Sequence, residues 1–222
     1  MLLIQQKFCR DSPLYKIHGR LNFMWKLLPF LIAFIFPLVF TTFVWAGDFY
    51  KGLLAAEKGD FLTALMEWEP LALAGDDMAQ FNLGQLYNKG GVDLPKSHET
   101  AAKWFSLAAD SGHAGAQYNL GWMYDNGYGV QKNLKVAVKC FILAAEQEDP
   151  DAQFNLAHHY ALGTGVKVDY VYAYMWASFS DSNGSKDGKK LRGYLEKLLN
   201  PSQKRESQKL SKECIRKKYQ GC

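Results

Sequence analysis

The residues with the most obvious potential for chemistry are the paired glycines of Gly127-Tyr128-Gly129. A glycine-rich loop can cradle a phosphate, but a dinucleotide-binding fingerprint needs a strand before the glycines and a helix that opens on the last one. Here a helical pattern, AQYNLGWMY, precedes the glycines, and the segment QKNLK follows before the next helical pattern. The sequence therefore favours a structural bend over a nucleotide-binding loop.

Motifs for metal-dependent or nucleophilic catalysis are absent from the sequence. His98-Glu99 lacks the second histidine of a zincin, and no C-x-x-C or G-x-S-x-G is present. His158 and His159 are adjacent, so on a helix they diverge by about 100° and cannot readily share one metal ion. No serine has a lysine three residues on, as the S-x-x-K motif of penicillin-binding enzymes requires. We therefore expect a protein that is not an enzyme and needs neither cofactor nor metal; an envelope enzyme acting on peptidoglycan or β-lactams remains the alternative.

The glycine-rich segment is one of three similar segments. AQYNLGWMYDNGYGV (116–130) is preceded by AQFNLGQLYNKGGV (79–92) and followed by AQFNLAHHYALGTGV (152–166). A fixed spacing of 36 to 37 residues indicates a solenoid of stacked repeats. A second series recurs in steps of 36 residues: Trp68, Trp104, Cys140 and Trp176. Because this series begins before the first AQ segment, we expect a degenerate helix pair upstream, and we expect Cys140 to lie in the core.

Each repeat is predicted to contain two helices. Ala116, Leu120 and Tyr124 fall on one side of a helix, and VAVKCFILAA (136–145) is apolar enough for a helix buried on more than one side. Neither helix can bury its apolar face alone, so the repeats must stack. The predicted fold is an all-α, α/α solenoid. Its predicted parts are a degenerate helix pair at 47–75, repeats at 76–112, 113–148 and 149–184, and a basic C-terminal helical cap at 185–222.

The repeat pattern resembles the Sel-one-like repeat family, a branch of the tetratricopeptide-type α/α solenoids, and in particular its exported bacterial members. The Ala, Leu-Gly, Tyr, Gly-x-Gly-Val and Ala-Ala positions all match, from Met78 to about Asp181. The pattern departs at Gly90-Gly91, which lack the spacer, and at Ala157, which replaces a glycine. The resemblance implies a protein-interaction scaffold whose first helices line an inner groove.

Two rows of side chains recur at equivalent places in the three predicted first helices. The partner-binding candidates are Asn82, Asn119 and Asn155 in one row and Gln85, Trp122 and His158 in the other. The rows lie only about 60° apart round the helix. Since an asparagine amide both donates to and accepts from a peptide backbone, the rows suit a peptide or helix of a protein partner. The alternative is that each asparagine braces its own loop or a neighbouring helix.

An apolar segment near the start of the chain, MWKLLPFLIAFIFPLVFTTFVWAG (24–47), carries no charge after Lys26 and follows a basic region. It is predicted to be a secretory signal peptide, cleaved after Ala46, with Met1 and Met24 as alternative starts. An uncleaved membrane anchor is the alternative. Both readings place the repeats outside the cytoplasm, and we expect the periplasm of a Gram-negative bacterium.

The charge of the chain is divided between its two ends. Residues 47–185 hold 9 basic and 17 acidic residues, a net charge of −8, whereas residues 186–222 hold 12 and 4, a net charge of +8. The sum is neutral, so composition gives no indication of nucleic-acid binding. We expect the basic tail to be the solvated face of a capping helix that starts at Asn200-Pro201-Ser202; contact with a membrane or glycan is the alternative.

Two cysteines lie close together near the end of the chain. Cys214 and Cys222 could pair in an oxidising compartment. The ending CIRKKYQGC is similar to endings of exported members of the Sel-one-like repeat family. This resemblance supports a disulfide between the two cysteines.

Overall fold

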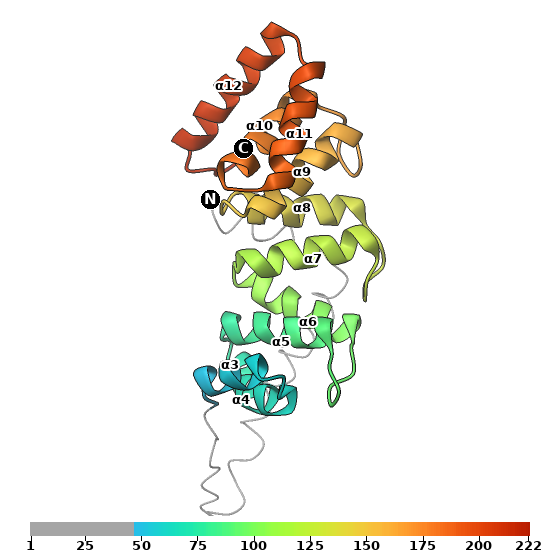
Figure 1. Cartoon of the computed structure of the whole chain (residues 1–222), viewed down its shortest axis with the longest axis vertical. Coiled ribbons are helices and arrows are strands. Elements are labelled where there is room, and N and C mark those ends of the chain that lie inside the picture. The colour runs from blue at the N-terminus through green and yellow to red at the C-terminus, as the bar shows by residue number, and fades with distance from the viewer. Residues whose placement is uncertain (1–46) are drawn as a thin grey trace, which may run out of the picture.

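The computed structural model describes residues 47–222, which form ten α-helices and no strand (Figure 1). The helices are α3 (Phe49–Glu57), α4 (Phe61–Leu73), α5 (Asp77–Lys89), α6 (His98–Asp110), α7 (Ala114–Asn126), α8 (Leu134–Ala145), α9 (Pro150–Leu162), α10 (Tyr170–Ser182), α11 (Lys186–Leu198) and α12 (Pro201–Arg216). The predicted all-α solenoid is confirmed. The predicted leader, residues 1–46, lies outside the described residues. No helix in the described part of the chain is long and apolar enough to span a bilayer.

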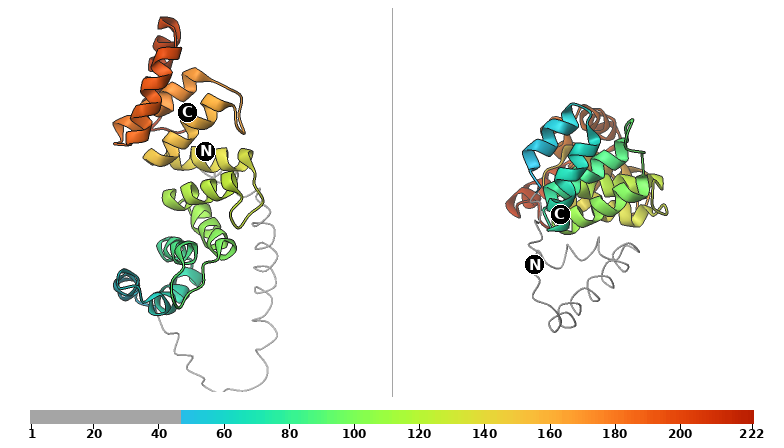
Figure 2. Two further views of the ribbon diagram at one scale, coloured as in Figure 1. Left: turned by 45° about the vertical axis from the view of Figure 1, so that its right-hand side comes forward. Right: turned by 90° about the horizontal axis from the view of Figure 1, so that it is seen from below.

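The helices stack in consecutive pairs along one curved row (Figures 1 and 2). α3 packs on α4, α5 on α6, α7 on α8 and α9 on α10, and the second helix of each pair also contacts the first helix of the next. α11 continues the row by packing on α10 and α9, whereas α12 crosses back to α10. The last two helices therefore close the C-terminal end of the stack.

Local sequence fixes where each helix starts. The ten residues that precede the helices accept a hydrogen bond from a backbone N–H of the first turn, which satisfies donors that have no partner inside the helix. They are Asp48, Asp60, Asp76, Ser97, His113, Asn133, Asp149, Asp169, Ser185 and Asn200. His113 is the unusual cap: its Nδ1 accepts from the Ala116 N–H at 3.2 Å, and its ring stacks on Phe81 of the preceding repeat.

A glycine on the first helix of a pair lets an aromatic ring of the second helix approach closely. A Cβ atom at Gly84 would lie 2.6 Å from the Phe105 ring, and one at Gly121 would lie 2.8 Å from the Phe141 ring. Both rings are fully buried. Repeat 3 has Ala157 in the glycine position and a buried alanine, Ala177, 36 residues after Phe141. The departure from the repeat pattern at residue 157 is thus matched by a smaller residue on the facing helix.

The same contact corrects the predicted register of the degenerate pair. A Cβ at Gly52 would lie 2.5 Å from the Trp68 indole, so Trp68 fills the place that Phe105 fills in repeat 1. The sequence series had aligned Trp68 with Trp104, which was wrong by one residue. The reason is that repeat 1 spans 37 residues rather than 36, and the spacing from Trp68 to Phe105 is likewise 37.

Buried glutamines join each second helix to the first helix of the next pair. The Nε2 atoms of Gln80, Gln117 and Gln153 donate to the carbonyls of Ala72, Ala109 and Ala145. The Oε1 of Gln117 accepts from Gln147 at 2.7 Å, and the Oε1 of Gln153 accepts from Asn183 at 3.0 Å. The Gln117 and Gln153 amides therefore each connect three successive helices, because Gln147 follows α8 and Asn183 follows α10.

The first of these glutamines lacks the second bond. The Oε1 of Gln80 is buried and has no hydrogen-bond partner within residues 47–222. The residue 36 positions before Gln147 is Ser111, whose shorter side chain donates to the Leu107 carbonyl of its own helix.

The variants Ser111→Gln and Ser111→Asn are expected to provide a side-chain amide that donates to the Gln80 Oε1. We expect each to stabilise the fold by about 1 kcal/mol, as a melting temperature would show. Ser182→Asn, at an exposed position, is the control, and no gain from either Ser111 variant would contradict the explanation.

Candidate functional site

The glycine pair of repeat 2 shapes a loop that rests on the preceding repeat. Gly127 ends α7 in the left-handed conformation (φ 80°), and Gly129 also has a positive φ (68°). A Cβ at Gly129 would lie 2.2 Å from the His98 backbone. The corresponding glycine of repeat 3, Gly165, meets the Leu134 backbone in the same way, at 2.5 Å. The loops therefore seat each repeat on the start of the previous second helix, as the sequence interpretation of a bend requires.

Tyr128, between the two glycines, builds an aromatic cluster across repeats 1 and 2. Its ring stacks on His98 with 5.1 Å between centroids and lies 4.9 Å from Trp122. His98 Nδ1 is 3.0 Å from the Asn88 Oδ1, and burial, with Lys96 nearby, lowers the pKa of the imidazole. Tyr128 remains 42% exposed. The cluster thus offers an aromatic surface that spans two repeats.

The row Gln85, Trp122 and His158 lies on α5, α7 and α9 and reaches solvent. Gln85 and His158 are exposed, and Trp122 is half-buried. The pKa of His158 is lowered by burial and then by His159, while Asp125 opposes the shift. A row with an amide, an indole and an imidazole can combine hydrogen bonds with apolar contact.

Two of the three side chains in the asparagine row already make hydrogen bonds within the protein. Asn82, Asn119 and Asn155 are all half-buried. The Nδ2 of Asn119 donates to the Gly115 carbonyl at 2.6 Å, and that of Asn155 donates to the Asp151 carbonyl at 2.8 Å, each four residues back on its own helix. Two of the three amides are therefore bonded within their own helix, and neither of these two bonds reaches a loop or a neighbouring helix.

Asn155 is also joined to the preceding repeat through Tyr118. Burial raises the pKa of the Tyr118 phenol, as do Asp151 and Asp149, whereas a hydrogen bond with Asn155 opposes the rise. Asn155 therefore helps to hold α9 against α7. Of the six candidate residues, the Gln85–Trp122–His158 row has the more accessible groups.

The two adjacent histidines occupy different environments. His159 is buried; its Nδ1 lies 2.8 Å from both the carbonyl and the hydroxyl of Thr164, and its Nε2 is 3.7 Å from Asp125. It fixes the loop after α9 to α7, while His158 faces solvent. Across residues 47–222, no group of three or more His, Cys, Asp or Glu residues is placed to hold a metal ion.

A cleft of about 400 Å³ opens beside the loop of repeat 2. It is lined by Glu99, Tyr124, Gly129, Val130, Gln131, Lys132 and Asn133. The carboxylate of Glu99 receives a hydrogen bond from Lys103 at 2.7 Å, which lowers its pKa. A carboxylate held in its charged form by a lysine is poorly suited to general acid catalysis near neutral pH.

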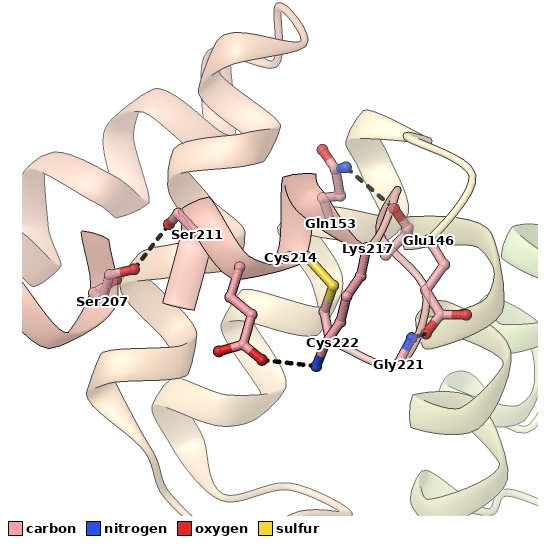
Figure 3. The surroundings of a disulfide bond; sticks show 10 residues. Glu146, Gln153, Ser207, Ser211, Cys214, Lys217, Gly221 and Cys222 are labelled. Carbon is pink, nitrogen blue, oxygen red and sulfur yellow. Dashed lines mark hydrogen bonds and ion pairs between the residues drawn. A yellow bond between two sulfur atoms is a disulfide. The ribbon is translucent and has the colours of Figure 1, made fainter. Parts of the chain in front are cut away.

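The C-terminal tail is joined to α12 by a disulfide and to repeat 2 by a long-range hydrogen bond (Figure 3). Cys214 of α12 is bonded to Cys222. The Gly221 N–H donates to the Glu146 carboxylate at 2.7 Å, and the Tyr219 ring packs edge-on against Phe179. The cap thus reaches back from the end of the chain to repeat 2.

The repeats in the middle of the chain match a known family. A profile of the Sel1 repeat matches residues 77–113, 114–149 and 150–179. Residues 77–179 thus form three Sel1 repeats. Sel1 repeat proteins are generally protein-interaction scaffolds, and their fold is typically non-catalytic.

Similar proteins share the repeats but differ in length. Protein sel-1 homolog 2 of Mus musculus is 37% identical over 85 residues, which cover 38% of this chain and 12% of the relative. The Homo sapiens protein of that name is also 37% identical, over 72 residues, covering 32% and 10%. This Sel1 repeat chain therefore spans about a tenth of the length of these relatives.

Two solved structures confirm the solenoid. A Sel1 repeat protein from Oxalobacter formigenes has a TM-score of 0.60 and 29% identity, over 66% of this chain and 60% of that one. The protein c5321, a protective antigen of uropathogenic Escherichia coli strains with an SLR fold, has a TM-score of 0.54 and 29% identity, over 77% and 45%.

Proposed function

We propose that this Sel1 repeat protein is a non-catalytic scaffold or adaptor of a bacterial cell envelope that binds a peptide or helix of a partner protein. The observation that carries the proposal is the Gln85–Trp122–His158 row, which sets accessible side chains of similar position on three successive first helices. A preformed row on a rigid stack binds a partner with little rearrangement. The aromatic cluster at Tyr128 extends this surface beside Trp122.

The proposed location is the periplasm, reached by cleavage of the leader after Ala46. The apolar segment that follows the basic region supports export. The disulfide between Cys214 and Cys222 suits an oxidising compartment. The two solved structures named above come from bacteria, which supports a bacterial envelope as the setting.

Partner binding can be tested by truncating the three side chains of the row, of which Trp122 also packs against the core. The variant Gln85→Ala/Trp122→Ala/His158→Ala is expected to lose the partner that the unchanged protein captures from envelope extracts. Since tryptophan is a frequent interface anchor, Trp122→Ala alone should weaken binding of the identified segment by about 2 kcal/mol, roughly thirtyfold in Kd. Titration of a labelled peptide from the partner measures this change.

A matched control distinguishes the row from the rest of the surface. Lys103→Ala/Lys135→Ala/Lys167→Ala changes three exposed residues on or beside the second helices of the repeats. Circular dichroism must show that both triple variants remain folded. Equal capture by the two variants would contradict binding at the row and would place the partner on another surface.

A further inference from the structure

The N-terminal helix pair presents apolar side chains on its outer surface. Tyr50, Leu53 and Leu54 follow each other round one side of α3, and Leu62, Met66 and Leu73 do so on α4. All six are between 38% and 75% exposed, and they are six of the fifteen large exposed apolar residues in the described part of the chain. Both α3 and α4 therefore carry exposed apolar side chains in addition to the apolar side chains that they bury in the core.

An apolar outer surface is unusual at the end of a solenoid, and α3 and α4 are the first helices in the described part of the chain. Terminal repeats need a polar outer face to keep the stack soluble, and monomers rarely expose large contiguous apolar patches. The surface of α3 is the place where the second helix of a preceding repeat would pack. This end of the stack is consequently built to be covered by another helical element.

The opposite end of the molecule carries a stripe that could provide such an element. Lys190, Tyr194, Lys197 and Leu198 are exposed and lie on one side of α11, at spacings of four, three and one residues. Tyr194 is 61% exposed and Leu198 is 48% exposed. An aromatic and an aliphatic side chain are thus flanked by two lysines on the outside of the cap.

The two ends are complementary in charge as well as in polarity. Residues 47–75 hold 5 acidic and 2 basic residues, a net charge of −3, whereas the cap at 186–222 carries +8. α3 and α4 lie at one end of the curved row, and α11 and α12 lie at the other (Figure 1). Since the two ends face away from each other, the cap of one molecule cannot contact the α3 and α4 surface of the same molecule.

We propose that the protein associates head to tail with a second copy of itself, the apolar surface of α3 and α4 in one molecule receiving the α11 stripe of the next. Apolar contact drives the association, and the lysines around Tyr194 and Leu198 pair with acidic residues of the facing end such as Glu57. The contact joins two different surfaces, so it propagates into short open chains rather than closing into a symmetric dimer.

The test is sedimentation velocity of the full chain, purified as the expressing cell delivers it, over a hundredfold range of concentration. We expect the weight-average sedimentation coefficient to rise with concentration, and to rise less at 1 M salt, where the Debye length is about 3 Å. Species at the mass of a dimer and above should appear. An intact mass records whether residues 1–46 are retained.

Two variants, each with one defective end, make the test specific. Leu54→Lys/Met66→Lys puts charges on the apolar surface, and Lys190→Glu/Lys197→Glu reverses the charge of the cap stripe. Each variant alone should remain monomeric. An equimolar mixture should form a dimer, because one intact surface of each kind remains. Lys135→Glu/Lys167→Glu, with the same charge change on the repeats, should associate like the unchanged protein.

The other outcomes overturn the proposal. A cap variant that still forms dimers would show contact between two N-terminal ends instead. A mixture that stays monomeric would exclude head-to-tail contact. An unchanged protein that is monomeric at every concentration would mean that another element, such as a retained segment 24–46 or a different partner, covers α3 and α4.

Discussion

Phe141→Ala is expected to lower the free energy of unfolding by about 3–5 kcal/mol, because the Phe141 ring is fully buried in the middle repeat. Gly121→Ala is expected to cost about 1–3 kcal/mol, because its Cβ would lie 2.8 Å from that ring. The double variant recreates the Ala157 and Ala177 pair of repeat 3, and the new methyl group partly fills the space that the ring leaves. We therefore expect the double variant to be more stable than the sum of the two single changes predicts, by at least about 1 kcal/mol.

A double-mutant cycle by chemical denaturation measures this coupling. Gly193→Ala is a matched control, because a Cβ there meets no atom within 4 Å. This helix-interior substitution should leave stability unchanged or raise it by up to about 1 kcal/mol. Additive effects of Gly121→Ala and Phe141→Ala would contradict the explanation that the two positions vary together. A destabilising Gly193→Ala would show that alanine is poorly tolerated for reasons other than contact.

The repeat period was the most informative feature of the sequence. It predicted the stacked helix pairs because self-similarity at 36 residues reflects the need of each pair to bury its apolar faces on the next. The same period placed Trp68 one residue out of register, since the spacing could not show whether the additional residue of repeat 1 precedes or follows its second helix. Only the contact with Gly52 identifies Trp68 as the counterpart of Phe105.

The candidate site was less predictable than the fold. Sequence spacing brought Asn82, Asn119 and Asn155 into one row, but it could not show that two of these amides bond to their own helices. Tyr128 was missed as a surface residue, although an aromatic between two glycines is a signal that a side chain projects from a tight loop. Hydrogen bonds of a side chain depend on its rotamer, which the pattern of residue types does not specify.

Removing the disulfide should loosen the end of the cap. Cys214→Ser/Cys222→Ser opens a loop whose ends are 8 residues apart, and the entropy of a chain loop of this length corresponds to about 2–3 kcal/mol. Without the bond, we expect Tyr219 to leave Phe179 and the Gly221 N–H to separate from Glu146. Hydrogen exchange of the C-terminal peptide should accelerate, and the melting temperature should fall by several degrees.

The part of the chain in which hydrogen exchange accelerates shows whether the disulfide only holds the tail in place or stabilises the whole stack. Because the tail contacts the ends of α8 and α10 rather than α5 or α7, exchange in repeat 1 should remain unchanged at temperatures well below melting. Gln208→Ser/Lys212→Ser introduces two serines at exposed positions of the same helix and should preserve the slow exchange of Gly221. If the cysteine variant retained that slow exchange, the hydrogen bond to Glu146 would hold the tail without the disulfide. If exchange rose equally in all repeats, the covalent link would stabilise the whole stack, and the cap would not act as a separate fastening.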